Sequence, residues 1–314
     1  MFAHDLCHRF SVVPYLLPYT RCGTVIRCPL EFGDMCVETP PRDGMNAVHD
    51  YSSQGAYMMP TVKGIGFDLF GTLVLQQRFS FDQCLDALYA SLQSSGFQLE
   101  KDTFLPLYRQ VNRRFVEQAR ADGRETYNRL WVAGALCSLG CAVDPADARV
   151  EAAVEAYFAP FIRSCEPIPG THDMLTHLNG RYRLGVVSNF THPPAVEQIL
   201  ARVGLKRFFD AIIISGRLGV CKPHPAIFNE LTRRLALASD EIMFVGDELQ
   251  ADIAGAQRAG MQTVWMTYRQ RLERPSPLGQ FLGMAEKAED IQPHHVVANW
   301  AEFLETLTGD LKRC

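Results

Sequence analysis

Four short polar signatures each follow an apolar run of this chain. They are Asp68-Leu69-Phe70-Gly71-Thr72, Ser188-Asn189, Lys222-Pro223, and Gly246-Asp247 with Asp252 shortly after it. A carboxylate at the carboxyl end of a parallel strand lies where open α/β sheets bind ligands. Carboxylates can act as nucleophiles or bind hard cations, and a lysine supplies a positive point charge. The signatures are therefore candidates for one chemical site.

Each signature alone has an ordinary structural explanation. Asp68 could cap a turn, Ser188 could cap the next helix, and Lys222 could be a solvated loop lysine. Asp252 could be a first-turn helix carboxylate. Four independent caps would have no reason to occur in this order, so the functional interpretation is favoured. The weaker candidates, which turn chemistry explains as well as function does, are Thr72 and Asn189.

The elements that must position these residues alternate between strands and helices. Strands are predicted at residues 64–67, 183–189, 211–215, 242–245, 262–266 and 295–297. Helices lie between them, and several end at a glycine. Apolar strands that alternate with helices indicate a parallel sheet covered on both faces, in an α/β fold.

Residues 80–165 differ from this pattern, because they predict helices without a convincing strand. Amphipathic runs follow one another at residues 80–96, 104–121, 126–139 and 144–162. Asp144-Pro145 opens the last run as an N-cap and N1 pair. A helical insertion of this size after the first strand of an α/β domain indicates a mobile cap. We therefore predict an irregular N-terminal extension at 1–58, a core domain at 59–78 and 166–314, and a cap domain at 79–165.

Composition excludes several classes of protein. Of the 314 residues, 47% are hydrophobic and 21% are charged, which is ordinary for a soluble globular protein. The net charge of -4 gives no basic surplus to neutralise a phosphate backbone, so we predict no nucleic-acid partner. No apolar run approaches the roughly 20 residues that cross a bilayer. We therefore predict no membrane association and a cytoplasmic location.

The spacing of the cysteines predicts reduced thiols rather than a cysteine metal site or a disulfide framework. No two of them form a C-x-x-C pair, and most are dispersed through apolar segments. The ten cysteines are Cys7, Cys22, Cys28, Cys36, Cys84, Cys137, Cys141, Cys165, Cys221 and Cys314.

The four ordered signatures resemble those of the haloacid dehalogenase superfamily, in the subfamily with a helical cap after the first motif. The resemblance covers roughly residues 60–300, and all four signatures in order at strand ends form a strong signal. It implies a Rossmann-like parallel-sheet core with an inserted α-helical cap domain. It also implies a hydrolase that acts on a small-molecule substrate, most often a phosphorylated one.

The resemblance implies a role for each signature in phosphoryl transfer. Asp68 would attack phosphorus and become an aspartyl-phosphate. Lys222 would place its positive charge beside Asp68 and the phosphoryl group. Phosphate oxygens would be held by Ser188 and nearby backbone N–H groups, with Thr72 and Asn189 as further candidates. The implied Mg²⁺ ligands are Asp68, the Phe70 backbone carbonyl and Asp247, with Asp252 as a ligand or as a residue that orients the site.

One position departs from the pattern of phosphatases in this superfamily. They usually carry a second Asp two residues after the nucleophile as acid and base, where this chain has Phe70. Losing a positioned acid or base typically removes roughly 10² to 10⁴ in rate. A haloacid dehalogenase, which has an aromatic residue there and uses no metal, is therefore an alternative. A catalytically degenerate binding protein is another.

Two acidic residues beside Asp68 argue against the metal-free alternative. Without a cation, Asp247 would repel Asp68 and raise a carboxyl pKa, which suits no nucleophile. Mg²⁺-dependent phosphotransfer is therefore favoured. We expect specificity to come from the cap and its hinges, near Gln76, Gln77, Arg78 and residues 124–131.

Overall fold

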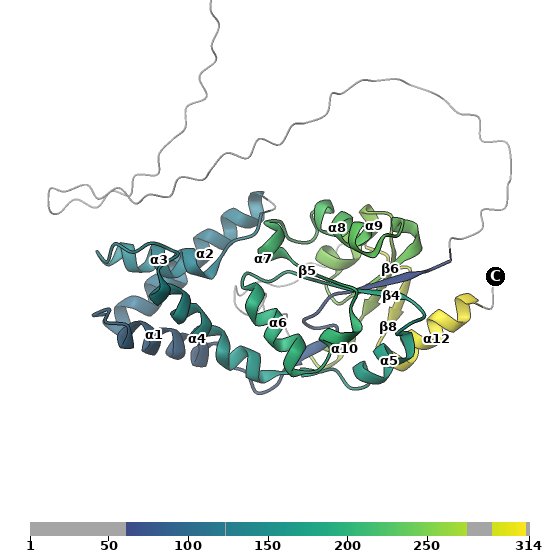
Figure 1. The fold of residues 1–314 in the computed structure, drawn as a ribbon, viewed down its shortest axis with the longest axis horizontal. Coiled ribbons are helices and arrows are strands. Elements are labelled where there is room, and N and C mark those ends of the chain that lie inside the picture. The colour runs from purple at the N-terminus through teal and green to yellow at the C-terminus, as the bar shows by residue number, and fades with distance from the viewer. Residues whose placement is uncertain (1–60, 123, 275–290, 312–314) are drawn as a thin grey trace, which may run out of the picture. The chain divides into compact units, whose positions relative to one another are not determined.

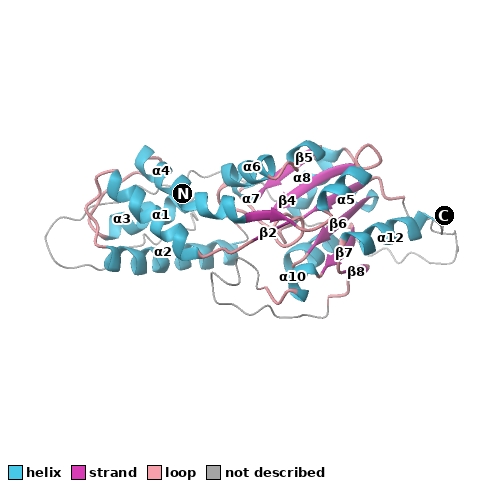
Figure 2. Ribbon diagram, turned by 90° about the horizontal axis from the view of Figure 1, so that it is seen from below, coloured by secondary structure: helices cyan, strands magenta, loops and turns pink. Residues whose placement is uncertain are grey.

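The computed structural model describes residues 61–122, 124–274 and 291–311. Six strands form one sheet in the order β5-β4-β1-β6-β7-β8, and every neighbouring pair is parallel (Figures 1 and 2). The strands are β1 (Gly64–Phe67), β4 (Arg183–Ser188), β5 (Ala211–Ile214), β6 (Ile242–Gly246), β7 (Gln262–Met266) and β8 (His295–Val297). The predicted parallel sheet is confirmed, and each strand lies within one residue of its predicted bounds.

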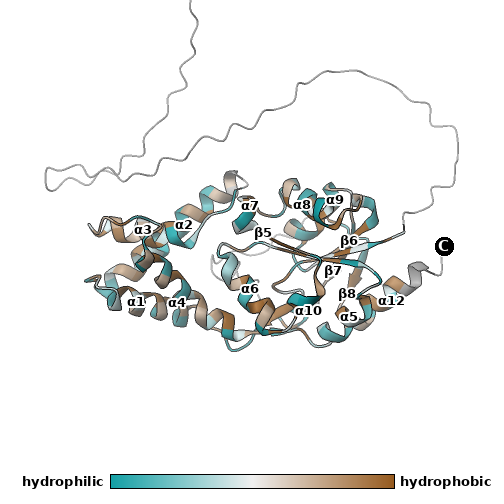
Figure 3. Cartoon of the chain, in the orientation of Figure 1, coloured by the Kyte–Doolittle hydropathy of each residue, from teal (hydrophilic) through white to brown (hydrophobic). Residues whose placement is uncertain are grey.

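Apolar side chains cover both faces of this sheet. Successive side chains of a strand point to opposite faces. In β6, Met243 and Val245 belong to one apolar cluster, whereas Ile242 and Phe244 belong to another. Figure 3 shows the apolar strands between the helices. Burial on both faces explains why these strands are continuous apolar runs in the sequence.

Helices supply the other half of each cluster. One face of the sheet packs against α5 (Thr171–Leu178), α6 (Pro193–Arg202) and α12 (Trp300–Leu311), and the other packs against α8 (Pro225–Leu235) and α9 (Gly255–Arg258). The short elements are α7 (Ser215–Leu218), α10 (Tyr268–Arg271), 3₁₀ turns at Lys206–Phe208 and Ser239–Glu241, and a π-helix at Leu249–Ala254.

Four further helices form a separate group with its own apolar core, which we call the helical block. They are α1 (Phe81–Ser94), α2 (Lys101–Asp122), α3 (Asn128–Ser138) and α4 (Ala148–Ser164). Leu88, Tyr108 and Leu136 are fully buried in this second core. The prediction of a helical segment here is therefore correct.

The predicted start of the last helix is wrong. Asp144 accepts a hydrogen bond from the backbone N–H of Ala146 at 2.7 Å, so it caps a turn before the helix. Asp147 is the N-cap instead, because its side chain accepts from the backbone N–H of Arg149 at 2.8 Å.

A second, two-stranded sheet lies at the two ends of the helical block and was not predicted. β2 (Val74–Gln76) and β3 (Cys165–Pro167) pair antiparallel, so the chain enters and leaves the block through adjacent strands. Each strand has only three residues, which is too short for an alternating pattern to be recognised.

Several predictions lie outside the described residues, including the N-terminal extension at 1–58 and the cysteines within it. Within the described part, burial raises the pKa of the Cys84 and Cys165 thiols to about 12, as for inert core thiols. None of the helices in the described ranges is both long and apolar enough to cross a membrane.

The aromatic packing under β1 generates a stability prediction. Phe303 is fully buried, and its ring lies 6.2 Å from that of Phe67, next to Asp68. Phe303→Ala should lower the free energy of unfolding by about 3–5 kcal/mol, because the cavity adds to the lost transfer energy. Urea denaturation measures this. Leu272→Ala, at a leucine that is 45% exposed, is the control and should change stability by about 0.5 kcal/mol at most.

Candidate active site

The carboxyl ends of three neighbouring strands meet at one edge of the large sheet. Asp68 follows β1, Ser188 ends β4 and Asp247 follows β6, and β1 lies between the other two strands. Asp68, Asp247 and Asp252 each offer one carboxylate oxygen that lies within 4.8 Å of the other two, and all three residues are buried. The parallel sheet therefore brings together carboxylates that are far apart in the sequence.

Lys222 lies between two of these carboxylates. Its Nζ donates to Asp68 Oδ1 at 2.6 Å, to Asp252 Oδ1 at 2.7 Å and to the carbonyl oxygen of Val187 at 2.9 Å. An ammonium group has three N–H bonds, so all of them are used. Lys222 is only 4% exposed. It is therefore a fixed positive charge beside Asp68.

The two weaker sequence candidates contact other site residues. Asn189 holds the backbone of Lys222, because its Nδ2 donates to the Lys222 carbonyl at 2.9 Å and its Oδ1 accepts from the Lys222 N–H at 2.7 Å. Thr72 Oγ1 donates to Asp247 Oδ1 at 3.3 Å. Direct phosphate binding by either side chain stays a prediction.

Asp252 has both carboxylate oxygens engaged. Oδ1 accepts from Lys222, and Oδ2 accepts from the backbone N–H of Glu248 at 3.0 Å. The π-helix carries Asp252 close to the end of β6, where a Cβ on Gly246 would overlap it. Whether Asp252 is a metal ligand or a residue that orients the site stays a prediction.

Asp247 is held by residues that the sequence analysis did not select. The guanidinium of Arg269 donates from Nε to Asp247 Oδ2. The Asp247 carbonyl accepts from Trp265 Nε1 at 3.0 Å and from Gln270 Nε2 at 2.7 Å. β7 is the neighbour of β6, so the residues that follow β7 lie at the same edge. That neighbour relation is the signal that could have identified Arg269.

Burial shifts the acid–base behaviour of this cluster. It raises the pKa of Asp68 to about 6, although Lys222 opposes the shift. It also raises the pKa of Asp247 well above its usual range, against the effect of Arg269. Burial acts on Lys222 in the opposite direction, but Asp252 and Asp68 outweigh it and raise the pKa of Lys222. A further positive charge among the carboxylates would favour their ionised forms.

Two buried polar atoms of the site have no hydrogen-bond partner among the described residues. They are Asp68 Oδ2 and Ser188 Oγ, which lie at the ends of adjacent strands. Buried polar atoms are normally satisfied, and an exception calls for a ligand, water or ion. The site therefore has one carboxylate oxygen and one hydroxyl available for something that binds there.

Phe70 lies in an aromatic cluster between the sheet and the helical block. Its ring centroid is 4.9 Å from that of Phe190 and 5.4 Å from that of Phe161 in α4. Phe158, also in α4, lies 5.3 Å from Phe190. The position two residues after Asp68 is thus used for packing and offers no titratable group.

Arg124 and Glu125 of the helical segment contact the loop that carries Lys222. Arg124 forms an antiparallel bridge with Val220, and the Glu125 N–H donates to the Gly219 carbonyl at 2.9 Å. Ser215 Oγ also donates to the Glu125 carboxylate. Part of the segment in which we expect specificity, residues 124–131, is therefore joined to this loop. Gln76, in contrast, contacts Arg274 through its carbonyl at 2.9 Å.

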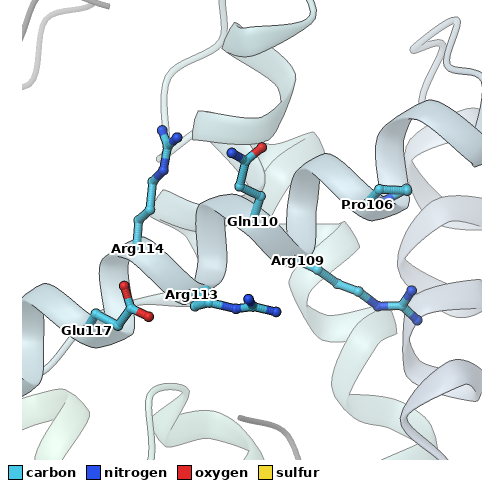
Figure 4. Close-up of a pocket in the computed structure, with 6 residues that line it drawn as sticks. All are labelled: Pro106, Arg109, Gln110, Arg113, Arg114 and Glu117. Carbon is cyan, nitrogen blue, oxygen red and sulfur yellow. The ribbon is translucent and has the colours of Figure 1, made fainter. Parts of the chain in front are cut away.

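A separate surface hollow of about 470 Å³ lies along α2 (Figure 4). It is lined by Pro106, Arg109, Gln110, Arg113, Arg114 and Glu117, which are all on that one helix. None of the carboxylates of the acidic cluster lines it. The chemistry of the buried cluster at the sheet edge argues for that cluster as the candidate active site.

A family model described as haloacid dehalogenase-like hydrolase matches residues 62–260. A second model, HAD-hydrolase-like, matches residues 220–303. The two matches together include all four polar signatures.

Curated relatives and a solved structure agree with these matches. A glyceraldehyde 3-phosphate phosphatase of Methanopyrus kandleri is 30% identical over 248 residues, which are 78% of this chain and 97% of that protein. A ribulose-1,5-bisphosphate 5-phosphatase of Halopiger xanaduensis is 28% identical over 63% of this chain and 82% of that protein. The fold is similar to that of a 2-haloacid dehalogenase from Pseudomonas syringae, with a TM-score of 0.55, 22% identity, and coverage of 79% of this chain and 99% of that one.

Gly71 generates a prediction for the geometry of the acidic cluster. Its φ is +98°, and a Cβ there would overlap Asp247 Oδ2. Gly71→Ala should cost backbone strain of about 1–2 kcal/mol and a further cost of displacing Asp247. Gly96→Ala is the matched control, because Gly96 has φ +90° but a Cβ there would meet no atom within 4 Å. Urea denaturation should show a larger loss of stability for Gly71→Ala, and equal losses would contradict this account.

Proposed function

The chain belongs to the haloacid dehalogenase-like hydrolase family, and on that premise we propose that it is a Mg²⁺-dependent phosphatase of a small phosphorylated substrate. Asp68 is the nucleophile in this proposal. The relatives support it, because the two curated ones described above are both named as phosphatases of small phosphorylated compounds. The substrate of this chain would belong to the same broad class.

The observation that carries the proposal is the state of the Asp68 carboxylate. One of its oxygens is held by Lys222, whereas the other is buried without a partner among the described residues. A nucleophile needs this combination of a fixed orientation and a free reacting atom. Oδ2 of Asp68 would attack phosphorus and the bond from phosphorus to the ester oxygen would break, with that oxygen taking a proton from water. A second water would then hydrolyse the aspartyl-phosphate, releasing phosphate and regenerating the Asp68 carboxylate.

Lys222 and Ser188 would hold the phosphoryl group during this transfer. Lys222 keeps its charge next to Asp68, where negative charge accumulates on the phosphoryl oxygens. Ser188 Oγ, buried and without a partner in the described chain, can donate to one of those oxygens. Asn189 would act through Lys222, whose backbone it holds on both sides.

The donor atoms of the cluster fit a magnesium ion. Both oxygens of Asp252 are engaged by Lys222 and Glu248, whereas Asp68 Oδ1 has one contact, to Lys222, and Asp247 Oδ1 has one contact, to Thr72. These two Oδ1 atoms would hold the ion, and Asp68 Oδ2 would stay free to attack phosphorus. Mg²⁺ prefers one or two carboxylates and keeps several waters. When bound, it would neutralise the charge between carboxylate and phosphate so that the two anions can approach. The Phe70 carbonyl stays a predicted third ligand.

The charge balance argues against metal-free dehalogenation. Three carboxylates share the site with two cationic side chains, Lys222 and Arg269, so a negative charge remains when all are ionised. A dication corrects this imbalance, whereas a 2-haloacid is itself a carboxylate at neutral pH and would add to it. The likeness to the solved dehalogenase concerns the fold. The degenerate-binder alternative rests on Phe70 alone and is not favoured, because the curated relatives are named as phosphatases.

The helical block would act as the cap of this site. We propose the domain boundaries predicted from the sequence, with the core at 59–78 and 166–314 and the cap at 79–165. The strands β2 and β3, through which the chain enters and leaves the block, lie at these boundaries and support them. A cytoplasmic location and the lack of a nucleic-acid partner stay predictions from the sequence.

The role of Asp68 is tested by Asp68→Asn. Phosphate release from a panel of small phosphate esters in the presence of Mg²⁺ should fall below detection, because an amide is no nucleophile, while circular dichroism shows a folded protein. EDTA should also abolish release from the unmodified protein, and added Mg²⁺ should restore it. Asp240→Asn, at an exposed carboxylate, is the control and should retain full activity. Phosphate release that persists in EDTA would contradict the metal requirement, whereas halide release from 2-haloacids in EDTA would support the dehalogenase alternative.

Phe70 generates a second test. Phe70→Asp should raise the rate of alkyl phosphate hydrolysis by about 10² to 10⁴, because a carboxyl group near the leaving oxygen can protonate it. Phe70→Leu controls for the loss of aromatic packing and should give no increase. Steady-state phosphate release measures both variants. No gain in Phe70→Asp would mean that the lack of an acid at this position is not what limits the rate.

A further inference from the structure

Arg269 is one of the most deeply buried large side chains in the described chain, with 2% exposure. Arginine is seldom buried unless it is paired. Here Nε donates to Asp247 Oδ2 and Nη1 donates to the carbonyl oxygen of Arg274 at 2.9 Å. The guanidinium is therefore fixed at two points, one on the carboxylate and one on the backbone.

These contacts restrict how Asp247 can present its carboxylate. Its backbone carbonyl is held by Trp265 and Gln270, so the main chain is anchored on the same side as Arg269. A charge-assisted bond to a guanidinium is among the strong hydrogen bonds in proteins. Oδ2 is thus occupied by the protein itself, whereas Oδ1 has only the longer contact to Thr72, at 3.3 Å, within the described chain.

Gly71 packs against the same carboxylate. A Cβ at this position would lie 2.3 Å from Asp247 Oδ2, 2.6 Å from Cγ and 2.8 Å from Oδ1, so the loop after β1 leaves the carboxylate no room to turn. Rotation that exchanges the two oxygens would have to displace both this loop and the guanidinium. The two elements therefore fix the carboxylate with Oδ2 on Arg269 and leave Oδ1 with only its contact to Thr72 among the described residues.

The number of oxygens that a carboxylate offers affects which divalent cation a site prefers. Mg²⁺ demands compact octahedral geometry and accepts one oxygen from each carboxylate, with waters in the other positions. Ca²⁺ takes six to eight oxygens and often binds a carboxylate through both of them. A site whose acidic ligand is limited to one oxygen disfavours Ca²⁺.

We propose that Arg269 is a positioning residue that limits Asp247 to one metal-binding oxygen and thereby makes the site select Mg²⁺ over Ca²⁺. The inference rests on the proposed function, because it assumes that a divalent cation binds at the acidic cluster. It goes further by assigning cation selectivity to one residue outside the four signatures.

A purely electrostatic role of Arg269 predicts a different result from a positioning role. Removing the positive charge of Arg269 would change the affinity for Mg²⁺ and for Ca²⁺ in the same direction, because both ions are divalent. Freeing Oδ2 changes the geometry of the ligand and favours the ion that uses both oxygens. The ratio of the two affinities therefore separates a positioning role from a purely electrostatic or structural one.

The test is calorimetric titration of the full chain with Mg²⁺ alone and with Ca²⁺ alone. In Arg269→Gln, the affinity for Ca²⁺ relative to Mg²⁺ should rise on the order of tenfold, the size of effect typical for residues that orient metal ligands. Arg274→Ala is the matched control. It removes a second guanidinium of the same segment, which binds the Gln76 carbonyl, but leaves the backbone carbonyl that Arg269 contacts. The ratio should not change in this control.

A measurement on the unmodified chain covers the case in which Arg269→Gln does not fold. A crystal structure with Ca²⁺, an ion that often binds a carboxylate through both oxygens, should still show Asp247 bound through Oδ1 alone and Arg269 Nε on Oδ2. An unchanged affinity ratio in a folded Arg269→Gln protein, or two-oxygen ligation by Asp247 in that crystal structure, would overturn the inference and leave the proposed function standing. If the unmodified chain binds neither cation, the metal-dependent function fails as well.

Discussion

The structure depends on a buried ammonium group shared between two carboxylates. Lys222 gives its three N–H bonds to Asp68, Asp252 and the Val187 carbonyl, and it is almost inaccessible to solvent. Burying such charges costs several kcal/mol for each ion unless every partner is in place. The sheet, the π-helix and the two hydrogen bonds from Asn189 to the Lys222 backbone are therefore all required to hold the Lys222 ammonium group in one position. This requirement explains why residues from four distant parts of the chain converge there.

The parallel sheet meets that requirement because its strands end at a common edge. The order β4-β1-β6-β7 places Ser188, Asp68, Asp247 and Arg269 along this edge, each from the end of a different strand or from the turn after it. Negative and positive side chains alternate around the cluster, with Lys222 on one flank and the guanidinium on the other. Apolar clusters on both faces of the sheet hold the strands in register beneath these groups.

Much of this arrangement could be predicted from the chain alone, because each apolar run directly precedes its polar residue. Asp68 and Asp247 were found in that way. Arg269 was not, because it lies in a short helix after β7 with no motif to mark it, and only the strand order reveals its position. The two hydrogen bonds of Asp252, with Lys222 and with the Glu248 N–H, are contacts that no spacing in the sequence encodes. Likewise, β2 and β3 have only three residues each, which is too few for an alternating apolar pattern to be recognised in the sequence.

The low exposure of the reacting groups has a kinetic consequence. Asp68 is 7% exposed and Ser188 is fully enclosed, so a phosphate ester cannot reach them in this conformation. Every catalytic cycle must therefore include a step that exposes these groups. One contact that such a step could break joins Glu125 to Gly219 through the backbone and to Ser215 through the side chain. Each such bond contributes about 1 kcal/mol, so separating these segments costs little.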